Sequence, residues 1–238
     1  GTLLMPVFAL FFPVELAVAA TAVVHGANNV LKASLLGRMA DWKVVAKFGI
    51  PAVIAALLGA WVLGLLSGTE PLARYAVLGR GASVTPLKLL MAALMTGFAA
   101  LELHPRFEKL QFDRRYLPAG GLLSGFFGGL SGHQGALRSA FLAKVGISPE
   151  AFVGTNAIIG LFVDLTRLSV YAALFLGTRL TSMAGPRERW LIAAGALAAL
   201  AGVLIGKRLL KKVTMKLVQR LTGVMLLLIA ALLGAGVI

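Results

Sequence analysis

The sequence has no cysteine and few charged residues, and these two shortages exclude several kinds of protein. Without cysteine, neither a disulfide framework nor a thiolate metal site can form. Charged residues make up only 13% of the chain, with 9 acidic residues against 23 basic ones. Of the three histidines, only His25 and His133 lie in apolar surroundings, so we expect no metal site.

Apolar residues, in contrast, make up 59% of the chain, and the mean hydropathy is +0.90. A soluble globule can hide apolar surface only in its interior, whereas a lipid-facing exterior removes that limit. We therefore predict an all-α polytopic membrane protein. The net charge of +14 is assigned to basic loops that orient the protein in the bilayer. Nucleic-acid binding is not expected, because aromatic residues do not interleave with the basic clusters.

Apolar runs long enough to cross a bilayer alternate with polar loops. The expected spans are residues 13–36, 48–67, 87–103, 149–177, 190–205 and 221–237. Loops are expected at 37–47, 68–85 and 179–189, with a basic stretch at 207–220. The polar connector 104–117 divides the chain into a first transmembrane repeat, 1–103, and a second one, 118–238.

The two halves resemble each other in the positions of their polar interruptions. When Glu15 is aligned with Glu150 without gaps, Asn29 meets Asp164. Such duplication is typical of transporters built from inverted repeats. The same register places a counterpart of the glycine-rich stretch described next before the first residue, so the first half apparently lacks its N-terminal half-hairpin here.

Residues 120–135, GGLLSGFFGGLSGHQG, contain seven glycines in sixteen positions. Each glycine costs a helix about 1 kcal/mol relative to alanine, so the backbone must bend here or approach another group closely. We interpret the stretch as a broken or re-entrant segment that turns near the bilayer midplane. Close packing between helices is the alternative. A re-entrant segment concentrates Lys and Arg loops on one side of the membrane, as the positive-inside rule requires, whereas a full crossing leaves no bias.

The glycine pattern, followed by GISPEAFVGTN, resembles the second repeat of the sulfite exporter TauE/SafE family. The segments PVELAVAAT and GRMADW resemble the matching elements of the first repeat. This resemblance covers essentially the whole chain and implies a multi-pass carrier of small anions such as sulfite, sulfonates or sulfur-containing organic acids. The family often has a GxGGG turn where this chain has GLSGHQG.

An oxyanion inside a membrane needs hydrogen-bond donors that cost little to desolvate, and helix N-termini and glycine amides supply them. Candidate substrate-binding residues are Gly128, Gly129, Ser131, Gly132, His133, Gln134, Gly135, Arg138, Thr155 and Asn156. Candidate transport-coupling residues are His25, Asn29, Lys32, Asp164 and Arg167. The alternatives are interfacial snorkelling for Arg138 and Lys32, a structural ion pair for Asp164 with Arg167, and interhelical hydrogen bonds for Thr155 and Asn156.

We predict a non-enzymatic secondary transporter, an exporter of small sulfur-containing anions that works by alternating access. It is expected to be a multi-pass protein of the cell membrane, the bacterial inner membrane. A proton or sodium ion as coupling ion and a homodimer are open possibilities. No Walker-type motif is present, so no ATP or other cofactor is expected. An anion channel is the first alternative. An intramembrane serine protease is the second, because Gly129–Gly132 reads GLSG, but its base would have to be His25.

Overall fold

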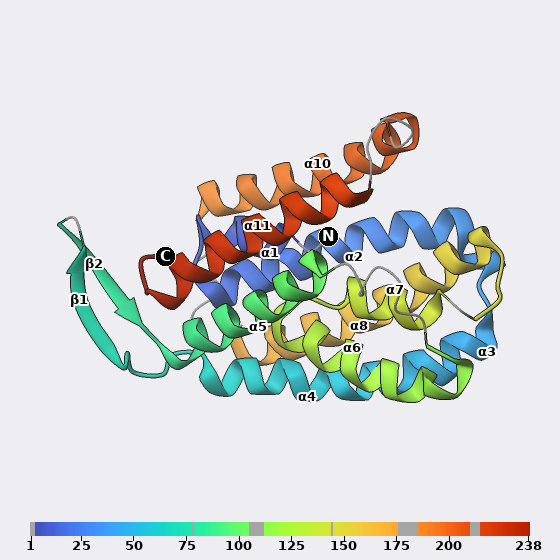
Figure 1. Ribbon diagram of the computed structural model, residues 1–238, viewed down its shortest axis with the longest axis horizontal. Coiled ribbons are helices and arrows are strands. Elements are labelled where there is room, and N and C mark those ends of the chain that lie inside the picture. Colours follow the sequence, from blue (N-terminus) through green and yellow to red (C-terminus); the bar gives the residue numbers. More distant parts are fainter. Residues whose placement is uncertain (1–2, 78, 105–111, 144, 176–184, 210–214) are drawn as a thin grey trace.

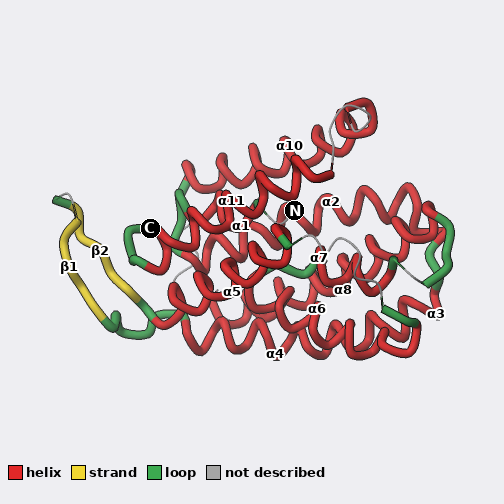
Figure 2. The backbone as a smooth tube through the Cα atoms, viewed as in Figure 1, coloured by secondary structure: helices red, strands yellow, loops and turns green. Residues whose placement is uncertain are grey.

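The computed structural model describes residues 3–77, 79–104, 112–143, 145–175, 185–209 and 215–238. Long helices form a bundle, and a short β-hairpin projects from one end of it (Figure 1). Most of the described chain is helical (Figure 2). Within the described residues, five helical stretches are long and apolar enough to cross a membrane: Val14–Met39, Trp42–Leu66, Pro86–Leu103, Pro149–Leu174 and Leu217–Gly234. The predicted class, a polytopic helical membrane protein, is confirmed.

The first half begins with a short helix and continues with three long ones. Its elements are α1 (Leu4–Ala9), α2 (Val14–Leu36), a 3-10 turn (Gly37–Met39), α3 (Trp42–Val44), a π-helical segment (Val45–Gly49), α4 (Ile50–Leu66) and α5 (Pro86–Leu103). The spans predicted at 13–36 and 87–103 match α2 and α5. The span predicted at 48–67 begins earlier, at Trp42, because α3, the π-helical segment and α4 are continuous.

The loop predicted at 37–47 is therefore wrong in its second part. The Asp41 carboxylate accepts hydrogen bonds from the backbone N–H groups of Lys43 at 3.0 Å and Val44 at 3.1 Å. These bonds cap the N-terminus of the helix and satisfy two donors that would otherwise have no partner within it. The loop therefore ends at the capping residue Asp41, and the span begins at Trp42.

The second half begins with a 3-10 turn at Arg114–Tyr116. Its elements are α6 (Leu117–Ser131), α7 (Gly135–Leu142), α8 (Pro149–Phe175), α10 (Pro186–Leu209) and α11 (Met215–Gly234). The three predicted spans of this half lie in α8, α10 and α11. Residues 105–111 of the connector 104–117 and residues 179–184 of the loop 179–189 lie outside the described residues. The two ends of the basic stretch 207–220 belong to α10 and α11.

A two-stranded antiparallel hairpin, β1 (Ala73–Val77) with β2 (Arg80–Val84), lies within the loop predicted at 68–85, so the loop prediction is wrong here although the chain as a whole is mostly helical, as predicted. Gly79 in the turn has φ 75°, a left-handed conformation that favours glycine. The hairpin is held against the end of α11: the Tyr75 hydroxyl donates to the Ala235 carbonyl, and the Ser83 N–H donates to the Gly236 carbonyl at 3.0 Å. Because an isolated hairpin is marginal in water, these contacts explain its order.

The glycine-rich stretch forms a helical hairpin, as predicted. α6 ends at Gly132, whose φ of 80° reverses the chain, and α7 begins three residues later and runs back (Figure 1). The two ends of the segment meet, because Arg114 Nε donates to the Val145 carbonyl at 2.7 Å. The rings of Phe112 and Phe141 also stack there, 4.1 Å apart. The segment therefore returns to the end of the bundle at which it starts.

Close packing, the alternative interpretation of the glycines, also applies to one face of α6. A Cβ atom on Gly121, Gly125 or Gly129 would lie closer than 3.0 Å to a backbone carbonyl oxygen of the neighbouring helix. Those carbonyls belong to Phe48, Ala52 and Ala56, which are spaced four residues apart like the glycines. One ridge of α6 thus lies directly on the backbone of the helix that contains α4, the geometry that small residues permit in membranes.

Large apolar side chains cover the outside of the bundle. Ile50, Trp61, Leu65, Trp190 and Leu228 are each more than half exposed. In water such a surface would be an aggregation liability, but it suits contact with lipid tails.

Candidate functional site

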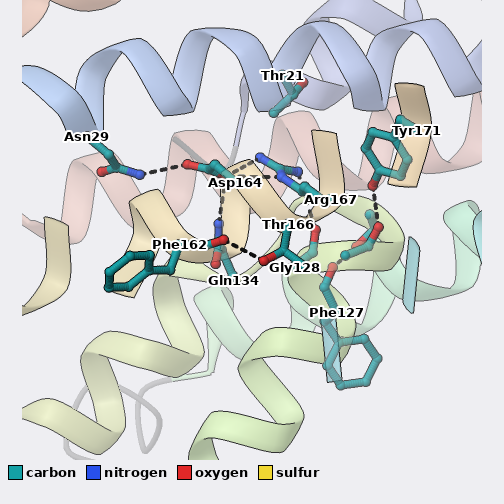
Figure 3. A network of polar contacts seen from close by, with 12 residues as sticks. Thr21, Asn29, Phe127, Gly128, Gln134, Phe162, Asp164, Thr166, Arg167 and Tyr171 are labelled. Carbon is teal, nitrogen blue, oxygen red and sulfur yellow. Dashed lines mark hydrogen bonds and ion pairs between the residues drawn. The ribbon is translucent and has the colours of Figure 1, made fainter. Parts of the chain in front are cut away.

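Two antiparallel helices, α2 and α8, bring polar side chains of both halves to the centre of the bundle. Gly37, at the end of α2, lies against Ile158 near the start of α8, and Gly26 lies against Asp164 farther along. Asp164 and Arg167 are fully buried. Arg167 donates to Asp164 Oδ1 from Nη2 at 2.7 Å and from Nε at 3.0 Å, so the predicted pair is formed (Figure 3).

Asp164 is the hub of a wider network. Asn29 Nδ2 of α2 donates to Asp164 Oδ2 at 2.7 Å, and Gln134 Nε2 donates to Oδ1 at 3.1 Å (Figure 3). One carboxylate therefore joins the first half, the hairpin tip and its own helix. Such a buried charge is tolerated because several donors compensate for its lost hydration.

The C-terminal end of α6 is held by donors from α8. Arg167 Nη1 donates to the Gly128 carbonyl at 3.3 Å, and the Tyr171 hydroxyl donates to the Gly129 carbonyl. The last carbonyls of a helix carry partial negative charge, and these contacts neutralise it. The Gly132 N–H is also engaged, with the carbonyls of Phe127 and Gly128.

A cavity of about 390 Å³ lies beside the hairpin tip. It contains nine of the predicted site residues, His25, Asn29, Lys32, Gly132, His133, Gln134, Gly135, Arg138 and Asn156. Asp164 and Arg167 lie behind it. Gly128, Gly129, Ser131 and Thr155 are not part of the cavity lining. Gly129 lies against the backbone of Ala56, and Thr155 Oγ1 accepts from the Asp41 N–H at 2.9 Å, the interhelical alternative for this residue.

Arg138 is the buried cation of this cavity, with 7% of its surface exposed. Its Nε donates to Asn156 Oδ1 and its Nη1 donates to Gln134 Oε1 at 3.2 Å. Both acceptors are neutral amides, and they use two of the five N–H groups of the guanidinium. Within the described residues, the ion pairs found do not include Arg138. Snorkelling is thus not its role, because a snorkelling side chain reaches water.

His133 contributes an aromatic wall and an unpaired nitrogen. Its ring stacks on Phe98 with centroids 5.2 Å apart, and its Nδ1 lies 3.2 Å from Ser131 Oγ. The Ser131 hydroxyl donates to the Phe127 carbonyl, so its oxygen accepts from His133 Nδ1. Nε2 finds no partner among the described residues. The protease alternative gains no support, because Ser131 lies against His133 rather than His25.

Among the residues of the site that sequence reasoning missed, Asn28, Glu102 and Gly160 bear most directly on its chemistry. Asn28 and Glu102 line the cavity, and a Cβ on Gly160 would lie 3.1 Å from both terminal nitrogens of Arg138. Asn28 had a visible signal, since it directly precedes the selected Asn29. Gly160 had none, because a lone glycine in an apolar helix usually serves helix packing.

Substitution of Gly160 by alanine is expected to disturb the site without unfolding the protein. The new methyl group would lie 2.6 Å from Asn29 Nδ2 and 3.1 Å from the Arg138 guanidinium, both ends of flexible side chains that can move. We expect an unchanged or slightly raised melting temperature, since alanine favours the helix by about 1 kcal/mol, and at least about tenfold weaker anion binding. Gly97→Ala, which meets nothing within 4 Å, is the control for both measurements. Full anion affinity in the Gly160 variant would contradict the placement of Arg138.

Comparison with known proteins also indicates a membrane transporter. The family model described as "Sulfite exporter TauE/SafE" matches residues 1–233. No curated protein and no solved structure matches the chain. The match covers nearly all of a sequence that forms several apolar helices, as a transporter of this kind requires. This multi-pass membrane protein therefore belongs to the sulfite exporter TauE/SafE family, which is a family of transporters.

Proposed function

We propose that the protein is a secondary carrier that exports a small sulfur-containing oxyanion, such as sulfite or an organosulfonate. The observation that carries this proposal is the environment of Arg138. Its guanidinium is buried in a cavity, and both hydrogen-bond acceptors found for it are neutral. A charge inside a membrane protein is stable only with compensation, and an anionic solute in the cavity would supply it. Lys32 and Glu102 line the same cavity, so its charged side chains, Arg138, Lys32 and Glu102, leave one positive charge in excess.

The helix ends at the tip support the same location for the anion. Gly135 and Ala136 begin α7 and line the cavity, so the positive end of that helix dipole and its first N–H groups lie beside the space. The negative end of α6 is occupied by Arg167 and Tyr171. We therefore assign anion contact to Gly135, Arg138, Asn156 and Lys32. Gly128, Gly129, Ser131 and Thr155 are assigned to shaping the tip.

Two inverted repeats, 1–103 and 118–238, are part of this proposal. The sequence register pairs Asn29 with Asp164, and these two side chains hydrogen-bond to each other. Residues related by a two-fold axis meet their own counterparts only when they lie at that axis. The antiparallel course of α2 and α8 also supports an axis in the membrane plane. Such symmetry is the basis of alternating access, in which His25, Asn29, Lys32, Asp164 and Arg167 would couple transport to a proton or sodium gradient.

Replacement of Arg138 by glutamine tests the carrier. In proteoliposomes, the unsubstituted protein is expected to show saturable sulfite uptake with counterflow, and Arg138→Gln is expected to lower it at least about a hundredfold, since a buried charged contact contributes roughly 3 kcal/mol. Arg115→Gln is the matched control, because Arg115 is exposed and the contact found for it among the described residues is with the neighbouring Tyr116 ring.

Three outcomes would contradict the proposal. Undiminished flux in Arg138→Gln would remove this residue from the anion site. Flux that does not saturate and shows no counterflow would favour a channel. Equal loss in Arg115→Gln would attribute the effect to net charge rather than to the cavity.

A further inference from the structure

A second concavity lies on the lipid-facing side of the bundle, away from the polar cavity. It is a groove of about 340 Å³ between the helix that begins at Trp42 and Phe162 of α8. Its lining is apolar and includes Trp42, Ala46, Gly49, Ile50, Ile54 and Phe162. On the long helix these residues recur every three or four positions, so they form one stripe along it.

Local backbone geometry creates this groove. Its floor coincides with the π-helical segment Val45–Gly49, where the helix is wider than a regular α-helix. Gly49 contributes no side chain to the floor. Trp42, Ile50 and Ile54 stand 58%, 61% and 59% exposed along it. An irregular segment inside an otherwise regular span is a recurrent mark of a functional position.

The length of the groove matches one leaflet of a bilayer. Twelve residues separate Trp42 from Ile54, and a helix rises about 1.5 Å per residue, so the groove is about 18 Å long. Half of a bilayer hydrocarbon core is about 15 Å thick. Trp42 lies at the polar end, the depth that tryptophan prefers at the membrane interface.

Basic residues of the described chain gather at that polar end. Lys43 and Lys47 are exposed and directly follow the groove residues Trp42 and Ala46 on the helix. Arg38 is exposed in the preceding 3-10 turn. The nearby Asp41 carboxylate is engaged with backbone N–H groups of the helix start. A chain-length apolar groove with cations at one end is complementary to an anionic phospholipid, with its acyl chain and its phosphate at matching positions.

We propose that this groove binds one anionic phospholipid, whose acyl chain lies along Ala46–Ile54 and whose phosphate contacts Lys43 and Lys47. A second copy of the chain fits less well. An isologous dimer through this face would bring the same lysines of both copies together, and like charges across an interface are costly. The lipid site is independent of the anion cavity, so either proposal can fail alone.

Lipid binding to the purified full-length protein tests this inference. Native mass spectrometry and thermal unfolding, with phosphatidylglycerol or phosphatidylcholine added to a neutral detergent, should show tighter binding and a larger stabilisation for phosphatidylglycerol. Lys43→Gln with Lys47→Gln should weaken phosphatidylglycerol binding by about thirtyfold, from the usual contribution of each basic residue near a lipid surface. Ala46→Trp should fill the groove and remove the bound lipid of either kind, while Arg115→Gln, which removes a charge elsewhere, should leave binding unchanged.

Several results would overturn the site. Equal binding of the two lipids by the unsubstituted protein, or an affinity for phosphatidylglycerol that does not fall with added salt, would show that no anionic headgroup is recognised; these measurements need no variant. Unaltered binding in both groove variants would place the lipid elsewhere. Loss of a dimer in Ala46→Trp without loss of lipid would identify a second copy as the occupant.

Discussion

Replacement of Asp164 by alanine is expected to destabilise the protein by about 3–5 kcal/mol, the range for breaking a buried ion pair. Arg167 is fully buried and would lose both bonds to the carboxylate. Asn29 and Gln134 would lose the acceptor for their amide groups at the same time. A buried cation without a counter-charge, held only by the Gly128 carbonyl, cannot reach water, so the protein would unfold or admit water around it. A strongly lowered melting temperature in detergent measures the effect.

The double variant Asp164→Ala with Arg167→Leu is the matched control. It removes both charges, and an apolar pair in place of a buried ion pair is often neutral or stabilising. We expect it to recover most of the lost stability while transport stays absent, since the hairpin tip loses Arg167 as well. If the double variant is as unstable as Asp164→Ala alone, the cost comes from Asn29 and Gln134 rather than from the unpaired cation.

Replacement of Gly125 by leucine is expected to displace the glycine hairpin from the bundle. A Cβ there would lie within 3.0 Å of the carbonyl oxygen, carbonyl carbon and Cα of Ala52. These are backbone atoms, which cannot rotate away as a side chain does. Overpacking usually lowers the free energy of unfolding by about 1–3 kcal/mol. We expect a larger loss here, because the clash is with helix backbone. Low yield of folded protein, early unfolding and loss of anion binding should occur together.

Gly97→Leu separates this effect from helix propensity. Gly97 lies on the exposed face of α5 and meets nothing within 4 Å, so leucine should be tolerated there and should favour the helix. A Gly125 variant as stable as the Gly97 variant would mean that α6 does not lie on the backbone of its neighbour as described.

The sequence alone predicts much of this architecture because the membrane imposes simple patterns. Apolar length determines the spans, and α2 and α5 match their predicted ranges closely. The bend follows from the cost of glycine in helices, and the pair of Asp164 with Arg167 follows from their spacing on one helix face.

Other features depend on contacts between distant segments, which composition does not reveal. The β-hairpin is ordered by hydrogen bonds from Tyr75 and Ser83 to the residues that follow α11, which are far away in the chain. The seven glycines look alike in sequence, yet Gly125 faces a helix backbone, Gly132 reverses the chain and Gly135 lines the cavity. Only the arrangement of the helices distinguishes these three roles.

The buried guanidinium also bears on stoichiometry. In the register that relates the halves, the residues corresponding to Arg138 are the apolar Leu3 and Leu4, at the start of α1. Under the proposed function, α1 would offer the anion no counter-charge at that position. The cavity beside α7 would then hold one anion in each cycle.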